Sequence, residues 1–194
     1  MRWIGFSSHA PAHVIKQAIE TDEFDYVNLH YHFEGSYTAS GDGDESFEGN
    51  LENIRLATKH DMGVFIISPY DKGGRLYAPS HQLRALTLPE MEPIDFGSYW
   101  LWFHKEHNTM GDTARVDTIV CGAARPSDLD QPVLAALRIR NEPTAVRADF
   151  NTVHSRVQER KESVFEKKWL DTWHLGLVST QLLYCQMPVL IKDS

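Results

Sequence analysis

The chain has 194 residues, of which 42% are hydrophobic and 24% charged, a composition typical of a globular protein rather than a disordered one. Its net charge of -8 lacks the excess of Lys and Arg that nonspecific nucleic-acid binding requires. No apolar run is long enough to predict a membrane span, and the first residues show no secretory signal. With only Cys121 and Cys185 and no CxxC pair, we expect neither a disulfide framework nor a zinc ribbon, but a cytoplasmic protein.

Apolar segments alternate with amphipathic ones along most of the chain. The strands we expect are residues 2–6, 24–31, 63–68 and about 116–121. The helices we expect are 11–24, 51–60, two aromatic-rich pieces at 81–88 and 95–107, a helix after the last strand, and a charged helix at 148–169. Such alternation is typical of a parallel sheet covered by helices, and therefore predicts an α/β fold.

Two parallel architectures compete for this pattern. A doubly wound open sheet usually shows a Gly-rich phosphate loop after its first strand. Here the first loop reads "SSHAP", and no GxGxxG motif occurs. A (β/α)8 barrel normally needs about 250 residues and eight strands, and this chain offers half of one.

Three segments resemble the aldo/keto reductases, in the order in which that family carries them. They are "RWIGFSSHAPAHVIKQAIETDEFDYVNLHYHF", "NLENIRLATKHDMGVFIISPYDKGGRLYAPS" and "TIVCGAARPSDLDQPVLAAL". The chain looks most similar to the branch that often ends in an iron–sulfur cysteine motif, which is absent here. The resemblance implies four βα units equivalent to the second half of a TIM barrel, with a half-barrel domain over 1–141 and a helical C-terminal tail over 142–194.

The matched half of the family's barrel mainly carries its NADP(H) site. By this resemblance, the serines after the first strand and an asparagine on the second would contact the nicotinamide amide, the turn after the third strand would approach the pyrophosphate, and an arginine would lie at the adenosine phosphate. These cofactor-binding residues are Ser7, Ser8, Asn28, Ser68, Tyr70, Lys72 and Arg125.

The chain departs from the family in two ways that bear on function. Asp128 and Pro132 stand where the family has Gln and Asn, and an acidic side chain beside a 2′-phosphate is unfavourable, so we expect NADP(H) to bind weakly at best. The family's catalytic Asp, Tyr, Lys and His belong to the missing first half. The resemblance therefore implies an NADP-dependent oxidoreductase represented by a truncated half without catalytic residues, inactive in isolation. A homo-oligomer or a first-half partner would complete the barrel for a small carbonyl substrate.

Each of these signals also has a purely structural interpretation. Serines at strand ends commonly cap the following helix, and Lys72 and Arg125 suit a solvated surface as well as a phosphate. The aromatic run "YWLWF" at 99–103 is typical of core. A second hypothesis is therefore a half barrel that acts only in binding or assembly.

A third hypothesis is a metal-dependent hydrolase. His30 and His32 are two apart on a strand, so both imidazoles share a face, as in many zinc and iron sites. His9 and the acidic loop with Asp42, Asp44 and Glu45 would be the other ligands. We consider buried histidines bonded to one another or to backbone the better interpretation, and expect no metal.

Overall fold

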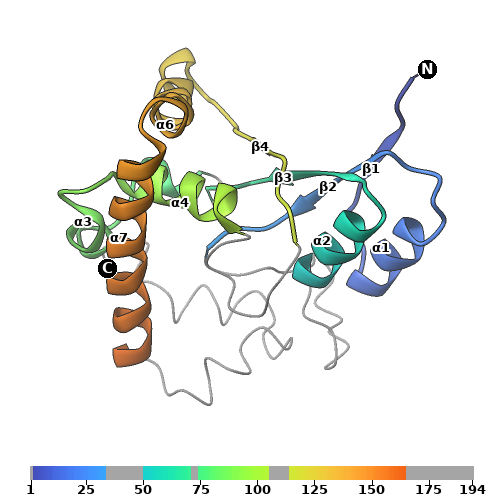
Figure 1. Ribbon diagram of the computed structural model, residues 1–194, viewed down its shortest axis with the longest axis horizontal. Coiled ribbons are helices and arrows are strands. Elements are labelled where there is room, and N and C mark those ends of the chain that lie inside the picture. Colours follow the sequence, from blue (N-terminus) through green and yellow to red (C-terminus); the bar gives the residue numbers. More distant parts are fainter. Residues whose placement is uncertain (1, 34–49, 71–73, 105–113, 165–194) are drawn as a thin grey trace.

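The computed structural model describes residues 2–33, 50–70, 74–104 and 114–164. Within them, four strands form one sheet: β1 (Gly5–Ser7), β2 (Tyr26–His30), β3 (Gly63–Ile67) and β4 (Thr118–Val120). All three neighbouring pairs are parallel, in the order β1-β2-β3-β4 (Figure 1). The predicted α/β fold with parallel strands is confirmed, although β1 begins later than expected, at Gly5.

Helices occupy the crossovers and the C-terminal region, as predicted. The described helices are α1 (Ala12–Ile19), α2 (Asn50–Lys59), α3 (His81–Thr87), α4 (Pro93–Trp102), α6 (Asp130–Asn141) and α7 (Pro143–Val164), with short 3-10 helices η1 (Arg75–Tyr77) and η2 (Pro126–Leu129). None of these described helices is long and apolar enough to cross a membrane. The acidic loop at 34–49 and the residues after 164 lie outside the described part of the chain.

The two faces of the sheet differ in burial. Val27, Leu29, Val64 and Ile66 point to one face and are fully buried there, against the side on which α1 and α2 lie (Figure 1). Of the alternate residues, Tyr26, Asn28, Phe65 and Ile67 are only half-buried, and no described helix lies over their face in that view, but His30 at the end of β2 is buried. This period-two pattern leaves the second face of the sheet, which we call the accessible face, less buried than the first.

Aromatic packing joins the helices at the carboxyl end of the sheet. Tyr99, Trp100 and Phe103 of the "YWLWF" run are buried, so its assignment to the core is confirmed. The buried face of α7 belongs to the same hydrophobic core, where the Phe150 ring stacks on Phe96 at a centroid distance of 5.7 Å. The C-terminal helical region up to residue 164 is thus packed on the α/β unit.

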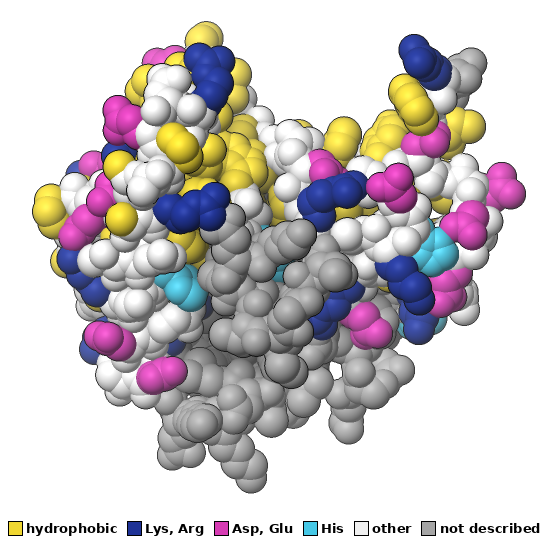
Figure 2. Space-filling view, in the orientation of Figure 1, with side chains coloured by type: hydrophobic (Ala, Val, Ile, Leu, Met, Phe, Trp, Pro, Cys, Tyr) yellow, Lys and Arg dark blue, Asp and Glu magenta, His cyan; other side chains and the backbone are white. Residues whose placement is uncertain are grey.

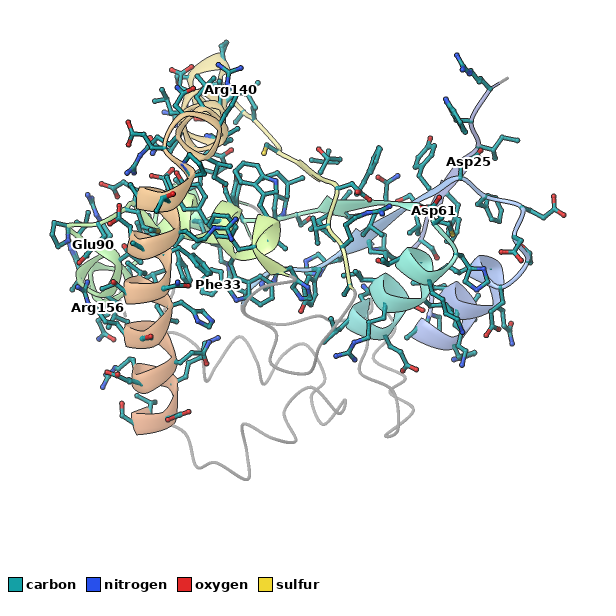
Figure 3. All side chains as sticks on the ribbon, in the orientation of Figure 1. Asp25, Phe33, Asp61, Glu90, Arg140 and Arg156 are labelled. Carbon is teal, nitrogen blue, oxygen red and sulfur yellow. The ribbon has the colours of Figure 1, made fainter. Side chains whose placement is uncertain are left out.

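An ion pair fixes the outer side of α7. The guanidinium of Arg156 donates one hydrogen bond to each carboxylate oxygen of Glu90, at 2.7 and 2.5 Å, and the two side chains meet beside α3 (Figure 3). This bidentate pairing lowers the pKa of Glu90 below its usual range. It ties α7 to the turn between α3 and α4.

Candidate functional site

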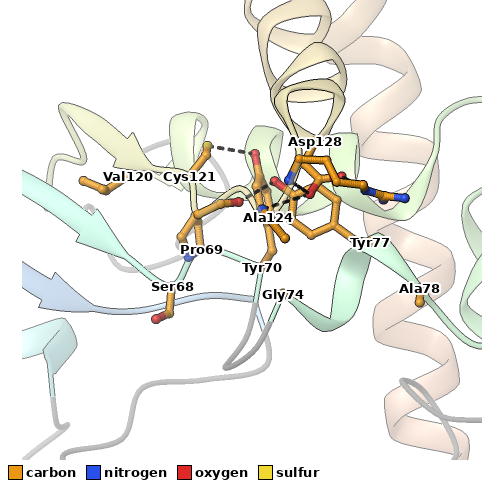
Figure 4. A pocket seen from close by; sticks show the side chains of 12 residues that line it. Ser68, Pro69, Tyr70, Gly74, Tyr77, Ala78, Val120, Cys121, Ala124 and Asp128 are labelled. Atoms are coloured by element: carbon orange, nitrogen blue, oxygen red, sulfur yellow. Dashed lines mark hydrogen bonds and ion pairs between the residues drawn. The ribbon is translucent and has the colours of Figure 1, made fainter.

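A pocket of about 690 Å³ opens at the carboxyl ends of β3 and β4 (Figure 4). Two loops form it, one following each strand, and parallel sheets characteristically bind ligands at this edge. The pocket brings together three of the residues expected from sequence, Ser68, Tyr70 and Arg125. The other lining residues are Pro69, Gly74, Tyr77, Ala78, Val120, Cys121, Gly122, Ala124 and Asp128.

Tyr70 has the most buried polar side chain among the lining residues of the pocket. Its hydroxyl lies 2.8 Å from the Ser98 Oγ of α4. It also lies 3.4 Å from the Cys121 Sγ, a contact that Figure 4 marks with a dashed line. Burial, and next the hydrogen bond with Cys121, raise the pKa of Tyr70 well above its usual range. The hydroxyl therefore stays protonated and holds the β3 and β4 loops together, instead of serving as a ready proton donor.

Arg125 and Asp128 form a compact polar cluster at the other end of the pocket. One Asp128 oxygen accepts hydrogen bonds from the backbone N–H groups of Ala124 and Arg125, at 3.0 and 2.9 Å. The other accepts from the Arg125 guanidinium, with Nε at 3.1 Å and Nη2 at 2.8 Å. The Arg125 backbone and guanidinium together lower the pKa of the Asp128 carboxyl. A carboxylate of this chain therefore occupies the donors that an external anion would use.

Ser68 has an unusual backbone at the point where β3 ends. Its φ of 52° lies in the left-handed region, which residues other than glycine seldom adopt. This conformation turns the chain sharply from the strand into Pro69 and Tyr70, and so shapes the pocket wall. Its hydroxyl points away from the Asp128 cluster in Figure 4.

The other expected cofactor residues lie elsewhere. Ser7 and Asn28 are register partners on β1 and β2, so their side chains lie side by side on the accessible face of the sheet. The Ser8 hydroxyl accepts a hydrogen bond from the Ala10 backbone N–H at 3.0 Å, a local turn contact, and it does not cap α1, whose N-cap is Pro11 without a side-chain hydrogen bond. None of the three lines the pocket, and Lys72 lies outside the described residues.

The histidines give no support to a metal site. The rings of His30 and His32 meet edge to face, 5.0 Å apart, and both side chains are buried. Burial, followed by the charge of Lys161, lowers the pKa of His32 to about 3, and a nearby ammonium also opposes a metal cation. In the described ranges no three or more His, Cys, Asp or Glu side chains come together as a ligand set. The loop with Asp42, Asp44 and Glu45 lies outside those ranges.

Among the nine lining residues that were not expected from sequence, Cys121 and Tyr77 have side chains that make hydrogen bonds at the pocket. Cys121 directly follows β4, and because parallel sheets bind ligands at the carboxyl ends of their strands, its place at the end of a predicted strand could have indicated it. Tyr77 closes one side, because its hydroxyl donates to the Gly122 carbonyl oxygen at 3.0 Å. No pattern in the sequence predicts the contact between Tyr77 and Gly122, which joins segments far apart in the chain.

Comparisons with known proteins assign the chain to no family. No protein-family model matches it, and neither a curated protein nor a solved structure does. The functional argument therefore depends on the geometry of the pocket and on the sequence motifs described above.

Proposed function

We propose that this chain is the cofactor-binding half of an NADP(H)-dependent oxidoreductase of the aldo/keto reductase type. The observation that carries the proposal is the pocket that unites Ser68, Tyr70 and Arg125 at the carboxyl ends of β3 and β4. These are the residues that the resemblance to the aldo/keto reductases assigns to the pyrophosphate and adenosine phosphate. In this proposal, the four βα units correspond to the second half of a TIM barrel, whose interior is the accessible face of the sheet.

The position of Ser7 and Asn28 supports a dinucleotide rather than a mononucleotide. They pair on β1 and β2, while the pocket lies beyond β3 and β4 in the same sheet. Three strand spacings of about 4.8 Å separate β1 from β4, about 14 Å in all. An extended dinucleotide could cover that distance along one edge, with its amide at Asn28 and its phosphates at the pocket.

Such an enzyme needs two groups for its reaction, a cofactor that supplies a hydride and an acidic side chain that supplies a proton. When bound, the cofactor supplies a hydride from nicotinamide C4 to a carbonyl carbon, and an acid protonates the oxygen. The residues of this chain would bind and orient the dinucleotide. Its buried Tyr70 hydroxyl is already engaged with Ser98 and Cys121, so the acid would have to come from a completing half.

Titration of the purified chain with NADPH, followed by cofactor fluorescence, tests the proposal. We expect a dissociation constant in the high micromolar range or weaker, about -5 kcal/mol, because Asp128 competes for the phosphate donors. Asn28→Ala and Ser68→Gly should each weaken binding further. Glycine is chosen at position 68 because it tolerates the observed φ of 52°. Ser163→Ala, at an exposed serine near the end of α7, is the matched control.

A second candidate is a non-catalytic binding or assembly module. The contact that favours it is the ion pair between Asp128 and Arg125. It neutralises the guanidinium that would otherwise attract a phosphate to the pocket. If NADPH binds with unchanged affinity to both Asn28→Ala and Ser68→Gly, the assigned cofactor site is wrong. No fluorescence change at millimolar NADPH would favour the module.

A further inference from the structure

Two charged side chains meet at the end of the pocket that the proposed function assigns to the adenosine phosphate. They are Asp128 and Arg125, and no other residue among the described ones that line the pocket carries a formal charge. NADPH carries a phosphate on the 2′ oxygen of its adenosine ribose, where NADH carries a hydroxyl. These two side chains therefore determine which of the two groups the pocket suits.

The backbone holds the Asp128 carboxylate in place. Its Oδ2 accepts hydrogen bonds from the N–H groups of Ala124 and Arg125, at 3.0 and 2.9 Å. The side chain is only 9% exposed. Rotation away from the pocket would deprive both N–H groups of this acceptor, which is unfavourable in a partly buried loop. An entering ligand therefore meets Asp128 in the position observed.

The Arg125 guanidinium is held less firmly. Its Nε and Nη2 both donate to the Oδ1 of Asp128, at 3.1 and 2.8 Å, but the side chain is 76% exposed. An exposed arginine can exchange such a contact for water at little cost in free energy. Of the two partners, the guanidinium is therefore the one that a ligand can displace, and the carboxylate is the one that remains.

A phosphate and a hydroxyl differ greatly as neighbours of a fixed carboxylate. Hydrogen bonds from the backbone and the guanidinium of Arg125 lower the pKa of Asp128, so it is ionised at neutral pH. A phosphate monoester carries about -1.5 to -2 charges at pH 7 and would lie beside that negative charge. A ribose hydroxyl can instead donate a charge-assisted hydrogen bond to the carboxylate, in place of the guanidinium. Carboxylates bind the 2′-hydroxyl of NAD in this way in other dinucleotide sites.

The other expected contacts do not distinguish the two cofactors. Ser7 and Asn28 are assigned to the nicotinamide amide and Ser68 to the pyrophosphate, groups that NADH and NADPH share. Figure 2 shows a hollow between the α6 side and the N-terminal side of the molecule, with hydrophobic side chains on both of its walls. Hydrophobic walls suit the rings that both cofactors also share. The preference therefore depends on the Asp128 end of the pocket.

We propose that Asp128 makes the site select NADH over NADPH, because its carboxylate accepts a hydrogen bond from the adenosine ribose and repels a 2′-phosphate. The inference rests on the proposed function, which brings a nicotinamide dinucleotide to this pocket. It departs from that function in the form of the cofactor, because the resemblance to the aldo/keto reductases implies NADP(H). Asp128 is thereby assigned as the residue that determines cofactor specificity.

Parallel titration of the purified full chain with NADH and NADPH, followed by cofactor fluorescence at low salt, is the first test. Both cofactors report through the same nicotinamide, so the two curves are directly comparable. We expect a dissociation constant for NADH about tenfold below that for NADPH. Equal affinity, or tighter binding of NADPH, overturns the inference and leaves the proposed function intact. Binding of neither cofactor at millimolar concentration refutes the proposed function, and the inference with it.

The variant Asp128→Asn is the second test. Its amide oxygen can still accept the N–H groups of Ala124 and Arg125, but the negative charge is gone. It should bind NADPH about tenfold more tightly than the unaltered chain does, and NADH no more tightly, so the preference should disappear. Damage to the loop would weaken both cofactors alike, so an unchanged ratio overturns the inference. Asp130→Asn, at an exposed carboxylate that does not line the pocket, should keep the tenfold preference.

The dependence on salt separates an effect of charge from one of shape. Repulsion between two anions is screened by salt, so the preference for NADH should fall about threefold between about 10 mM and about 500 mM NaCl. In Asp128→Asn the ratio of the two dissociation constants should change by less than about twofold over the same range. A preference independent of salt, or an equal salt dependence in the two proteins, overturns the assignment to the Asp128 charge.

Discussion

Asp128 accepts hydrogen bonds from both the backbone and the guanidinium of Arg125, so the only arginine among the pocket-lining residues is already neutralised by a carboxylate three residues away. The same carboxylate also holds the Ala124 backbone N–H. An incoming phosphate would find these donors occupied and a negative charge beside them. The backbone and guanidinium donors at this end of the pocket thus already bind a carboxylate of the chain itself.

Asp128→Asn should therefore tighten NADPH binding. The substitution keeps the shape of the side chain, removes its charge and frees the Arg125 guanidinium for a phosphate. We expect about a tenfold lower dissociation constant, since one unfavourable charge contact at a partly exposed site is typically of that size. Cofactor fluorescence titration at low salt measures it.

The control for this prediction is an acidic residue away from the pocket. Asp130→Asn removes an exposed carboxylate two residues further on that does not line the pocket, and we expect less than a twofold change. Equal tightening by both substitutions would mean that net charge, not the Arg125 contact, limits binding. Weaker binding in Asp128→Asn would show that Asp128 itself contacts the ligand.

His32 should make the stability of the protein sensitive to mild acid. Burial and the charge of Lys161 lower its pKa to about 3, whereas an unfolded histidine has a pKa of about 6.5. Between these values the unfolded chain binds a proton that the folded chain does not. The free energy of unfolding therefore falls as pH drops below about 6.5, by up to about 1.4 kcal/mol per pH unit from this group.

Urea unfolding between pH 7 and pH 5 checks this slope, in a range above most carboxylate titration. His32→Gln cannot bind the proton and should flatten the slope, whatever it does to the absolute stability. Gln17→Ala, at an exposed residue of α1 without a titratable group, should leave the slope unchanged. An unaltered slope in His32→Gln would assign the pH dependence to other groups.

The strands could be located from sequence because buried strands consist of apolar residues. The run from Gly63 to Ile67 is apolar throughout, and β3 is the strand it predicts. The same rule placed the first strand too early, at Trp3 and Ile4, which are apolar but exposed. Pairing with β2 begins only at Gly5, opposite Tyr26. An apolar run shows that a segment avoids water, but it does not show which neighbour covers it.

The pocket was only partly foreseeable. Ser68 was expected at a binding site because the resemblance to the aldo/keto reductases places it in the turn after the third strand, and the pocket includes it. The contacts that set its chemistry were not, because Tyr70 meets Ser98 and Cys121 from three separate segments. For Asp128 the sequence indicated repulsion of a phosphate. It did not show that the carboxylate would take the backbone donors itself.

Phe150→Ala should destabilise the whole described fold rather than α7 alone. The ring is 1% exposed and packs on Phe96 and Phe103 of the common core. Loss of a buried phenyl ring typically costs about 3–5 kcal/mol. Urea unfolding followed by circular dichroism should show one transition, shifted to lower denaturant.

Thr152→Ala, on the exposed side of α7, is the matched control, and we expect a change within about 0.5 kcal/mol. Two separate transitions in Phe150→Ala, with only the first one shifted, would mean that residues after 142 fold as an independent tail.

The isolated chain should not reduce aldehydes with NADPH, whether it is a monomer or a pair of identical copies. Hydride transfer builds negative charge on the carbonyl oxygen, and a positioned acid contributes about 10²–10⁴-fold to the rate. Tyr70 is the tyrosine nearest the expected cofactor, but its raised pKa and its contacts with Ser98 and Cys121 make it a poor donor. Tyr77 is committed to the Gly122 carbonyl, and Tyr26 stacks on Phe65, toward the amino end of its strand.

A second copy adds no acid that the first one lacks, so pairing alone should not produce turnover. The measurement is NADPH absorbance with a reactive aromatic aldehyde, compared with the Tyr70→Phe variant and with buffer. We expect the same slow background in all three. Turnover by the unaltered chain that persists in Tyr70→Phe would point to another acid in the molecule. Turnover that disappears in Tyr70→Phe would identify this buried hydroxyl as the acid, and would require substrate binding to break its contacts with Ser98 and Cys121 and lower its pKa.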